Sequence, residues 1–277
     1  MKWNNNIKQG ELKEVFDSLE EAFLATGTDY YLIGALARDV WYARGNKTFR
    51  QTKDVDFAIL VGSVHEFEAI KDYLKEKKNF QDSKGNSFVM MTPSGMQVDI
   101  LPFGSIEIDD GVHLGGKGLT SIKVNGFREV YDKGTEDVQM ETGHHFKIAT
   151  LSSIVLLKLI AYDDRPEQRS KDARDIANII THYFDLQADR IYADHADLFC
   201  DDNENWSLQD ISAAVIGREI GQTAAHNGEL LQRLRGILQK HTVGKEDSAF
   251  IRQIVTETER SVEVCVVWLQ RMLEMLA

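Results

Sequence analysis

The residues that interrupt helices are unevenly distributed along this chain, and this constrains its fold more than any other feature. Most of the 20 glycines lie between positions 34 and 143, where β-turns would need them. Beyond residue 150 the chain consists of long amphipathic segments with few glycines or prolines. The distribution predicts an α+β protein whose N-terminal domain, residues 1–147, holds a small mixed sheet flanked by helices. An all-helical C-terminal domain, residues 148–277, is expected to follow.

Charge and composition exclude several broad classes of protein. The formal net charge is −12, from 44 acidic and 32 basic residues, so we expect no extended grip on nucleic acid. The two cysteines, Cys200 and Cys265, form no disulfide framework. The N-terminus lacks a signal peptide, and no apolar stretch approaches the ~20 residues that span a bilayer. We therefore expect a soluble cytoplasmic protein with no membrane partner.

Hydrophobic spacing predicts the secondary structure in more detail. Residues 87–91 and 96–101 flank Pro93-Ser94-Gly95, which indicates a hairpin. The other expected strands span 30–33 and 54–61. The expected helices span 11–26, 35–44, 64–78, 151–163, 169–182, 207–225, 228–241 and 246–275.

Three acidic residues lie on these predicted strands. Asp54 and Asp56 begin an apolar strand, and residues two apart on a strand point to the same face, ~7 Å apart. Asp99 interrupts the apolar returning strand of the hairpin, where an acid needs a partner, water or a metal ion. Such carboxylates can bind hard divalent cations. A lone pair of this kind is more often a turn or a solvated edge, so the pattern needs support.

That support comes from a strand–glycine–helix element upstream. Gly34 ends one predicted strand and opens a helix, where a close backbone approach and free N–H groups suit a phosphate. Arg38, one turn into that helix, can reach the same anion. Together with the three acids, this arrangement predicts a site for a metal ion and a phosphate.

These residues resemble those of the DNA polymerase β-like nucleotidyltransferases. The stretch from Ile33 to Asp39 is similar to the glycine-containing helix start of that superfamily, and Asp54-Val55-Asp56 is similar to its paired acids. Downstream, 157–161 with Arg165 and 171–176 resembles a signature of the abortive-infection AbiEii-type toxin nucleotidyltransferases. The resemblance covers about residues 28–180.

The resemblance implies a metal-dependent transfer of a nucleoside monophosphate from a nucleoside triphosphate to a hydroxyl acceptor. Asp54, Asp56 and Asp99 would hold two Mg²⁺ ions, with Mn²⁺ as an alternative, and Asp99 would act as general base. Lys158 would neutralise the triphosphate as charge develops on it. The implied nucleotide contacts come from the residues Gly34, Ala35, Arg38, Lys158, Lys171, Asp172 and Asp175. Asp172 and Asp175 lie three apart on one helix face, so they can instead orient Lys158 or Lys171.

Two departures from the family pattern leave alternatives open. Ala35 stands where a serine or second glycine is usual, so a hydroxyl contact to phosphate is missing. The gap from Gly34 to Asp54 is long and carries Lys47, Arg50 and Lys53, which are either solvated or face the nucleotide.

The acceptor and the partners are likewise open on the sequence alone. A toxin of this kind would modify tRNA, protein or another cellular target and have an antitoxin protein as its partner. The alternatives are a small-molecule enzyme of the aminoglycoside-modifying kind and a non-catalytic nucleotidyltransferase-like binding module. The stretch 185–204, which holds seven acids and one base, is either a solvated surface or a docking surface for a basic partner.

Overall fold

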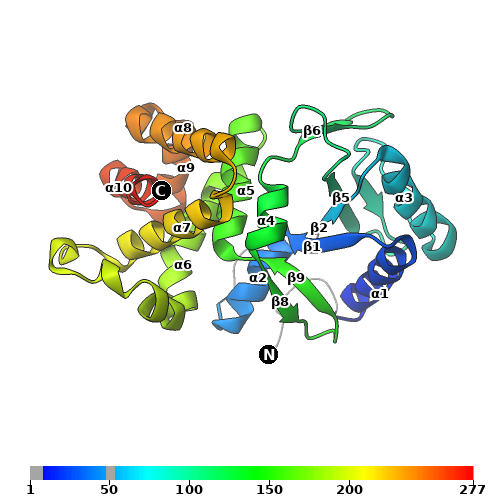
Figure 1. The fold of residues 1–277 in the computed structure, drawn as a ribbon, viewed down its shortest axis with the longest axis horizontal. Coiled ribbons are helices and arrows are strands. Elements are labelled where there is room, and N and C mark those ends of the chain that lie inside the picture. Colours follow the sequence, from blue (N-terminus) through cyan, green and yellow to red (C-terminus); the bar gives the residue numbers. More distant parts are fainter. Residues whose placement is uncertain (1–8, 48–53, 277) are drawn as a thin grey trace. The chain divides into compact units, whose positions relative to one another are not determined.

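The structure is a computed structural model that describes residues 9–47 and 54–276. It is an α+β protein that divides into two compact units, shown in blue to green and in green to red in Figure 1. Unit 1 runs to Tyr131 and includes Thr135–Thr150, and unit 2 contains Asp132–Gly134 and resumes at Leu151. Among the described residues, no helix is both long and apolar enough to cross a membrane.

Unit 1 is built on a mixed seven-stranded sheet with the order β3-β4-β5-β2-β1-β9-β8. Its centre pairs β2 with β1 in antiparallel and with β5 in parallel orientation. The predicted hairpin is present as the antiparallel pair of β4 and β5. The strands are β1 (Asp29–Ile33), β2 (Asp54–Leu60), β3 (Gln81–Asp82), β4 (Val89–Met91), β5 (Gln97–Phe103), β8 (Thr135–Gln139) and β9 (His145–Ala149). A separate ribbon pairs β6 (Gly111–His113) with β7 (Ser121–Lys123).

Helices of unit 1 bury the apolar residues of the central strands. Helix α1 (Gln9–Thr26) lies beside α3 (Val64–Lys78), as Figure 1 shows. Phe16 and Phe23 of α1 pack edge-on against Phe57 of β2, with ring centroids 6.2 and 5.8 Å apart. Because side chains alternate along a strand, Asp54 and Asp56 lie on the face opposite to Phe57. Helices α2 (Gly34–Arg44) and α4 (Phe127–Lys133) complete the unit.

Unit 2 is entirely helical. Its α-helices are α5 (Leu151–Asp164), α6 (Ser170–Asp194), α7 (Leu208–Ala224), α8 (Gly228–Gly244), α9 (Ala249–Thr258) and α10 (Val262–Glu274). Short 3-10 turns η1 (Ala196–Leu198), η2 (Asp201–Asn203) and η3 (Lys245–Asp247) connect them. Helices α6 and α7 both pack on α5, and α10 packs on α7 and α8.

Two helix predictions for this unit are wrong in extent. The helix expected over 169–182 continues to Asp194 through a non-helical residue, Gln187, because Tyr183, Phe184 and Ile191 remain buried. The helix expected over 246–275 is two helices, because Glu259 adopts a left-handed conformation (φ 55°) and the Ser261 side chain caps α10.

Candidate functional site

The three predicted strand acids lie close to one another in unit 1. Strands β2 and β5 are parallel, and their register pairs Asp56 directly with Asp99 and Asp54 with Gln97. Paired residues on neighbouring strands point to the same face, so all three carboxylates share the face opposite to Phe57. Asp54 is exposed, while Asp56 and Asp99 are half-buried. The three carboxylates therefore lie on one face of the sheet, on the neighbouring interior strands β2 and β5.

Gly34 lies directly beneath one of these carboxylates. On the other side of β2, Asp56 is paired with Ile33, the last residue of β1. Gly34 follows with a φ of +70°, and a Cβ atom there would lie 2.3 Å from Asp56 Oδ2. Any other residue would displace the carboxylate. The glycine is thus required both for the turn and for the close approach.

Helix α2 begins at this glycine with its first N–H groups near the carboxylates. Its N-cap residue is Ile33, whose apolar side chain cannot accept their hydrogen bonds. The first turn of a helix is a favourable position for an anion, because N–H groups and the helix dipole both attract negative charge. Ala35, the second residue of α2, lies in this turn.

Arg38 is buried within α2 and pairs with the neighbouring Asp39. Its side chain is 1% exposed, and Nε and Nη2 donate to Asp39 Oδ1 at 3.0 and 2.7 Å. The guanidinium also lies over the Tyr42 ring, 6.0 Å from its centroid. The contacts of Arg38 with Asp39 and Tyr42 thus lie within α2, and its contact with a phosphate stays a prediction.

Carboxylates of this kind fit a divalent cation by their chemistry, since Mg²⁺ prefers oxygen ligands. Within residues 9–47 and 54–276, however, no group of three or more His, Cys, Asp or Glu side chains lies at metal-binding spacing. The amide Nε2 of Gln97 donates to Asp99 Oδ1 at 2.7 Å, which holds that carboxylate in a defined orientation. The carboxylate oxygens of these residues are suitable ligands for such an ion. In the described residues, however, they are not arranged as a metal-binding site.

The second predicted group of residues lies in unit 2. Lys158 of α5 donates to Asp172 Oδ1 at 2.6 Å and pairs with Asp175 Oδ2 at 2.8 Å, both on α6. All three side chains are largely buried, and Arg169 Nη1 lies 3.8 Å from Asp172 Oδ2. Burial lowers the pKa of Lys158, but the two carboxylates more than offset this and raise that pKa above its usual value. The lysine is thus held as a cation.

Other predicted residues lie apart from these contacts. Lys171 is exposed at the start of α6. Asp172 and Asp175 were predicted, as one alternative, to orient either Lys158 or Lys171, and in the structure both pair with Lys158. Arg50 and Lys53 of the basic loop lie outside the described residues. Two neighbours were not predicted: Asp39, the partner of Arg38, and Gln97, the donor to Asp99. Gln97 stands two residues before Asp99 on the same strand, and this spacing is the signal that could have identified it.

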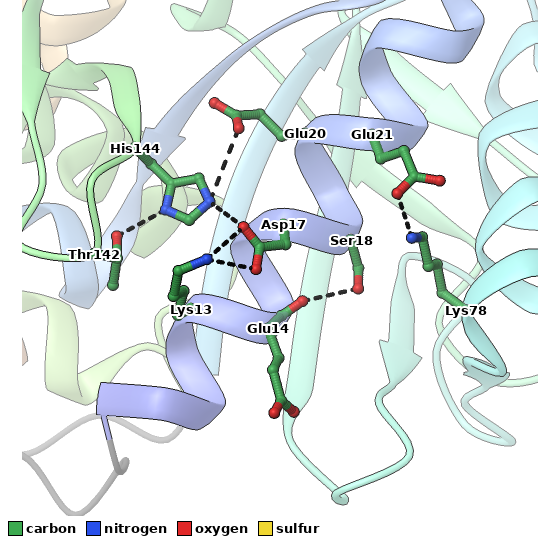
Figure 2. Close-up of polar contacts among 9 residues, drawn as sticks. All are labelled: Lys13, Glu14, Asp17, Ser18, Glu20, Glu21, Lys78, Thr142 and His144. Atoms are coloured by element: carbon green, nitrogen blue, oxygen red, sulfur yellow. Dashed lines mark hydrogen bonds and ion pairs between the residues drawn. The ribbon is translucent and has the colours of Figure 1, made fainter.

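A separate polar cluster on α1 has a structural role (Figure 2). Lys13 donates to both oxygens of Asp17 at 3.0 and 2.8 Å, and the buried His144 ring bonds Asp17 and Thr142 at 3.1 and 2.8 Å. These contacts attach α1 to the turn between β8 and β9. A hollow of ≈ 770 Å³ beside them reaches Asp29 and Tyr30, at the opposite end of β1 from Gly34. It is therefore distinct from the carboxylate site.

Comparison with known proteins gives one family match. The family described as "Nucleotidyl transferase AbiEii toxin, Type IV TA system" matches residues 19–265. No curated protein sequence matches the chain.

Three solved structures are similar to this chain at low sequence identity. A nucleotidyltransferase-like antigenic protein from Paracoccidioides brasiliensis is 18% identical over 68% of this chain and 90% of its own, with a TM-score of 0.40. The antibiotic-resistance factor ANT(2'')-Ia is 10% identical over 84% of this chain and 100% of its own, with a TM-score of 0.40. The lincosamide antibiotic adenylyltransferase LnuA is 14% identical over 62% of this chain and 98% of its own, with a TM-score of 0.37.

Proposed function

Since this chain belongs to the AbiEii family of toxin nucleotidyltransferases, and is therefore a nucleotidyltransferase, we propose that it moves a nucleoside monophosphate from a nucleoside triphosphate to a hydroxyl group of cellular RNA. One observation supports the proposal that this reaction takes place at the start of α2 and on strands β2 and β5. Asp56 lies against Gly34 at the start of α2 and is paired with Asp99 on β5. Acids and an anion-binding helix start are thereby next to each other.

In this proposal the residues of unit 1 have different roles in the reaction. The first N–H groups of α2, from Gly34 and Ala35 onward, bind the triphosphate, and Gly34 allows its close approach. Asp99, oriented by Gln97, accepts the proton of the acceptor hydroxyl. That oxygen then bonds to the α-phosphorus, the bond to the bridging oxygen breaks, and pyrophosphate leaves. Asp54, Asp56 and Asp99 would hold divalent metal ions, Mg²⁺ or Mn²⁺, which supply positive charge to the phosphates.

Lys158 is proposed to supply a further positive charge to the triphosphate. Its two carboxylate partners keep it protonated and fix its ammonium group. A cation that is oriented in advance stabilises developing negative charge better than a mobile one. Asp172 and Asp175 therefore act as positioning residues for Lys158, and Lys171 remains a proposed nucleotide contact.

The family's type IV toxin–antitoxin description also bears on partners. We propose an antitoxin protein as the cellular partner of this chain and a nucleoside triphosphate as its donor substrate. The net charge of −12 favours a local contact with RNA over an extended one.

Label transfer tests this function and its acceptor. The protein is incubated with Mg²⁺ and each α-labelled nucleoside triphosphate, together with total RNA or with a panel of aminoglycosides. We expect label on RNA with the wild-type chain and none with the Asp54→Ala/Asp56→Ala variant. Label on an aminoglycoside alone would replace RNA by a small-molecule acceptor. No transfer and no nucleotide binding with any donor would contradict the proposed function.

A further inference from the structure

Three aromatic side chains, two of them exposed, form a cluster near the end of α6, apart from the residues of the proposed reaction. Tyr192 and Phe199 stack with ring centroids 5.1 Å apart and an interplanar angle of 24°. Both pack edge-on against the buried Phe184, at 5.7 and 6.3 Å. We call these three residues the aromatic patch. The segment between α6 and α7, which includes η1 and η2, is drawn in yellow in Figure 1.

The patch leaves much of its apolar surface in water. Tyr192 is 57% exposed and Phe199 is 43% exposed. Aromatic rings gain free energy on burial, and exposed apolar patches on a protein surface often mark an interaction site. The fold of unit 2 does not need these outer ring faces, so they are available to a partner.

Several acidic residues lie close to the patch in the sequence. Asp189 stands one helical turn before Tyr192, and Asp201 and Asp202 follow Phe199 closely in the chain. The single base of the stretch, Arg190, is used by the buried Glu219 at 3.1 Å, and Asp197 is paired with Arg218. Over the described part of the chain, Asp189, Asp194, Asp201 and Asp202 form no ion pair. The segment that carries the rings therefore has an excess of negative charge.

Buried polar contacts hold the backbone next to the aromatic patch in place. His195, which directly follows α6, is buried, and its Nδ1 lies 3.3 Å from Arg218 Nη1. Its Nε2 lies 3.6 Å from Glu219 Oε1. Glu219 also accepts a hydrogen bond of 2.5 Å from the Tyr183 hydroxyl. A surface that is ordered before binding loses less conformational entropy when a partner binds.

We propose that the aromatic patch and its carboxylates form a docking surface for an arginine-rich segment of a partner protein. Guanidinium groups stack on aromatic faces and pair with carboxylates, whereas a lysine ammonium is a compact, strongly hydrated charge. Charge complementarity excludes RNA and anionic lipid as occupants. The surface is a binding function that nucleotidyl transfer does not use.

The chain provides a specific reporter for this binding. Cys200, next to Phe199, is exposed, and Cys265 is buried, so a thiol-reactive fluorophore labels the patch selectively. The labelled protein is titrated with nonapeptides of arginine, lysine or glutamate at 150 mM salt, and calorimetry on unlabelled protein checks the values. We expect arginine to bind at least fivefold more tightly than lysine, and glutamate not to bind.

Variants of exposed residues decide the outcome. Tyr192→Ser/Phe199→Ser should weaken arginine binding at least tenfold and abolish the preference over lysine, while label transfer stays as in wild type. The melting temperature should fall, because Phe184 loses both of these packing partners, so binding is measured well below it. Val243→Ser, an 82% exposed apolar residue on α8, should change nothing. Equal binding of arginine and lysine, or unchanged binding by the double variant, would overturn the proposal. Self-association that the double variant abolishes would also overturn it, since the occupant would then be a second copy.

Discussion

Gly34 is the residue on which the geometry of the carboxylate site depends most directly. Its positive φ turns the chain from β1 into α2, and its missing side chain leaves room for the Asp56 carboxylate. Gly95 of unit 1 also has a positive φ but does not adjoin a carboxylate. Gly95 has a φ of +86°, and a Cβ atom there would meet nothing within 4 Å, so this residue separates the two effects.

Gly34→Ala should therefore cost both stability and activity. The strained φ is expected to lower the free energy of unfolding by more than ~1 kcal/mol. Displacement of Asp56 should lower label transfer at least about tenfold, since small misplacements at a reaction centre are costly. Gly95→Ala is the control and should lose stability only. Equal activities of the two variants, measured beside urea unfolding, would show that Asp56 is not tied to Gly34.

Gln97 is the second residue whose role follows from one contact. Its amide donates to Asp99 at 2.7 Å, so Gln97→Leu should remove one of the contacts that orient that carboxylate. We expect kcat to fall about tenfold with KM for the nucleotide little changed, because the Gln97 contact orients Asp99 for its proposed role as base, while the start of α2 still binds the triphosphate. Steady-state kinetics with varied nucleotide provide the test. A rise in KM at constant kcat would assign Gln97 to nucleotide binding instead.

At the scale of elements, one buried ion pair joins α5 to α6. Lys158→Met leaves Asp172 and Asp175 buried without their cation, and breaking such a pair typically costs about 3–5 kcal/mol. We expect a loss of this order in urea unfolding. Lys240→Met is the matched control, because Lys240 also pairs with an aspartate, Asp163, but is 61% exposed. That variant should lose less than ~1 kcal/mol, and similar losses in the two variants would contradict this role of Lys158.

The junction of α8 with α9 should make unit 2 sensitive to acid. His241 is buried against Phe250 and bonds Ser248 at 2.9 Å, and burial, followed by nearby Lys240, lowers its pKa to about 4. A lowered pKa means that protons bind the unfolded chain preferentially. The contribution of His241 is therefore present above pH ~6.5 and is lost as the pH falls toward 4.

His241→Gln should remove that part of the pH dependence. Between pH 7 and pH 5 we expect the wild type to lose about 1–2 kcal/mol more unfolding free energy than the variant. His226→Gln, at an exposed position, should behave as the wild type does. Urea unfolding at both pH values gives the comparison, and parallel losses in wild type and His241→Gln would refute the assignment.

The sequence predicted helices and strands well where the spacing of apolar residues and the position of glycine, proline or capping residues indicate the same bounds. The helix over 64–78 has the predicted bounds, and the hairpin around Pro93-Ser94-Gly95 is present. The break at Glu259 was missed because neither glycine nor proline marks it, although Ser261 is a good N-cap residue. Strand β8, at the edge of the sheet and mostly exposed, carries no clear alternation to find.

For the site, the sequence predicted that the three acids lie on strands, but it did not predict which residues of the two strands are paired. That Asp56 lies beside Asp99 depends on the register of β2 with β5, which a single sequence does not encode locally. The catalytic roles of these residues stay predictions. Arg38 shows the limit of local reasoning, because its burial against Asp39 results from how α2 packs.

At the scale of the whole molecule, the excess of acidic residues over basic ones comes from two different regions. Asp54, Asp56 and Asp99 belong to the proposed reaction site on the sheet of unit 1, whereas the acids of 185–204 belong to the surface of unit 2. A net charge of −12 does not oppose phosphate chemistry if positive charge is supplied at the site by N–H groups and metal ions.

The rate of label transfer by Asp99→Asn in the full chain tests the central claim most directly. The substitution preserves size but removes the proposed base, and Asp137→Asn, on the exposed edge strand β8 of the same sheet, is the matched control. We predict a loss of about 10²–10⁴-fold for Asp99→Asn and less than about twofold for Asp137→Asn. Transfer by Asp99→Asn at the rate of Asp137→Asn would contradict a reaction site on β2 and β5.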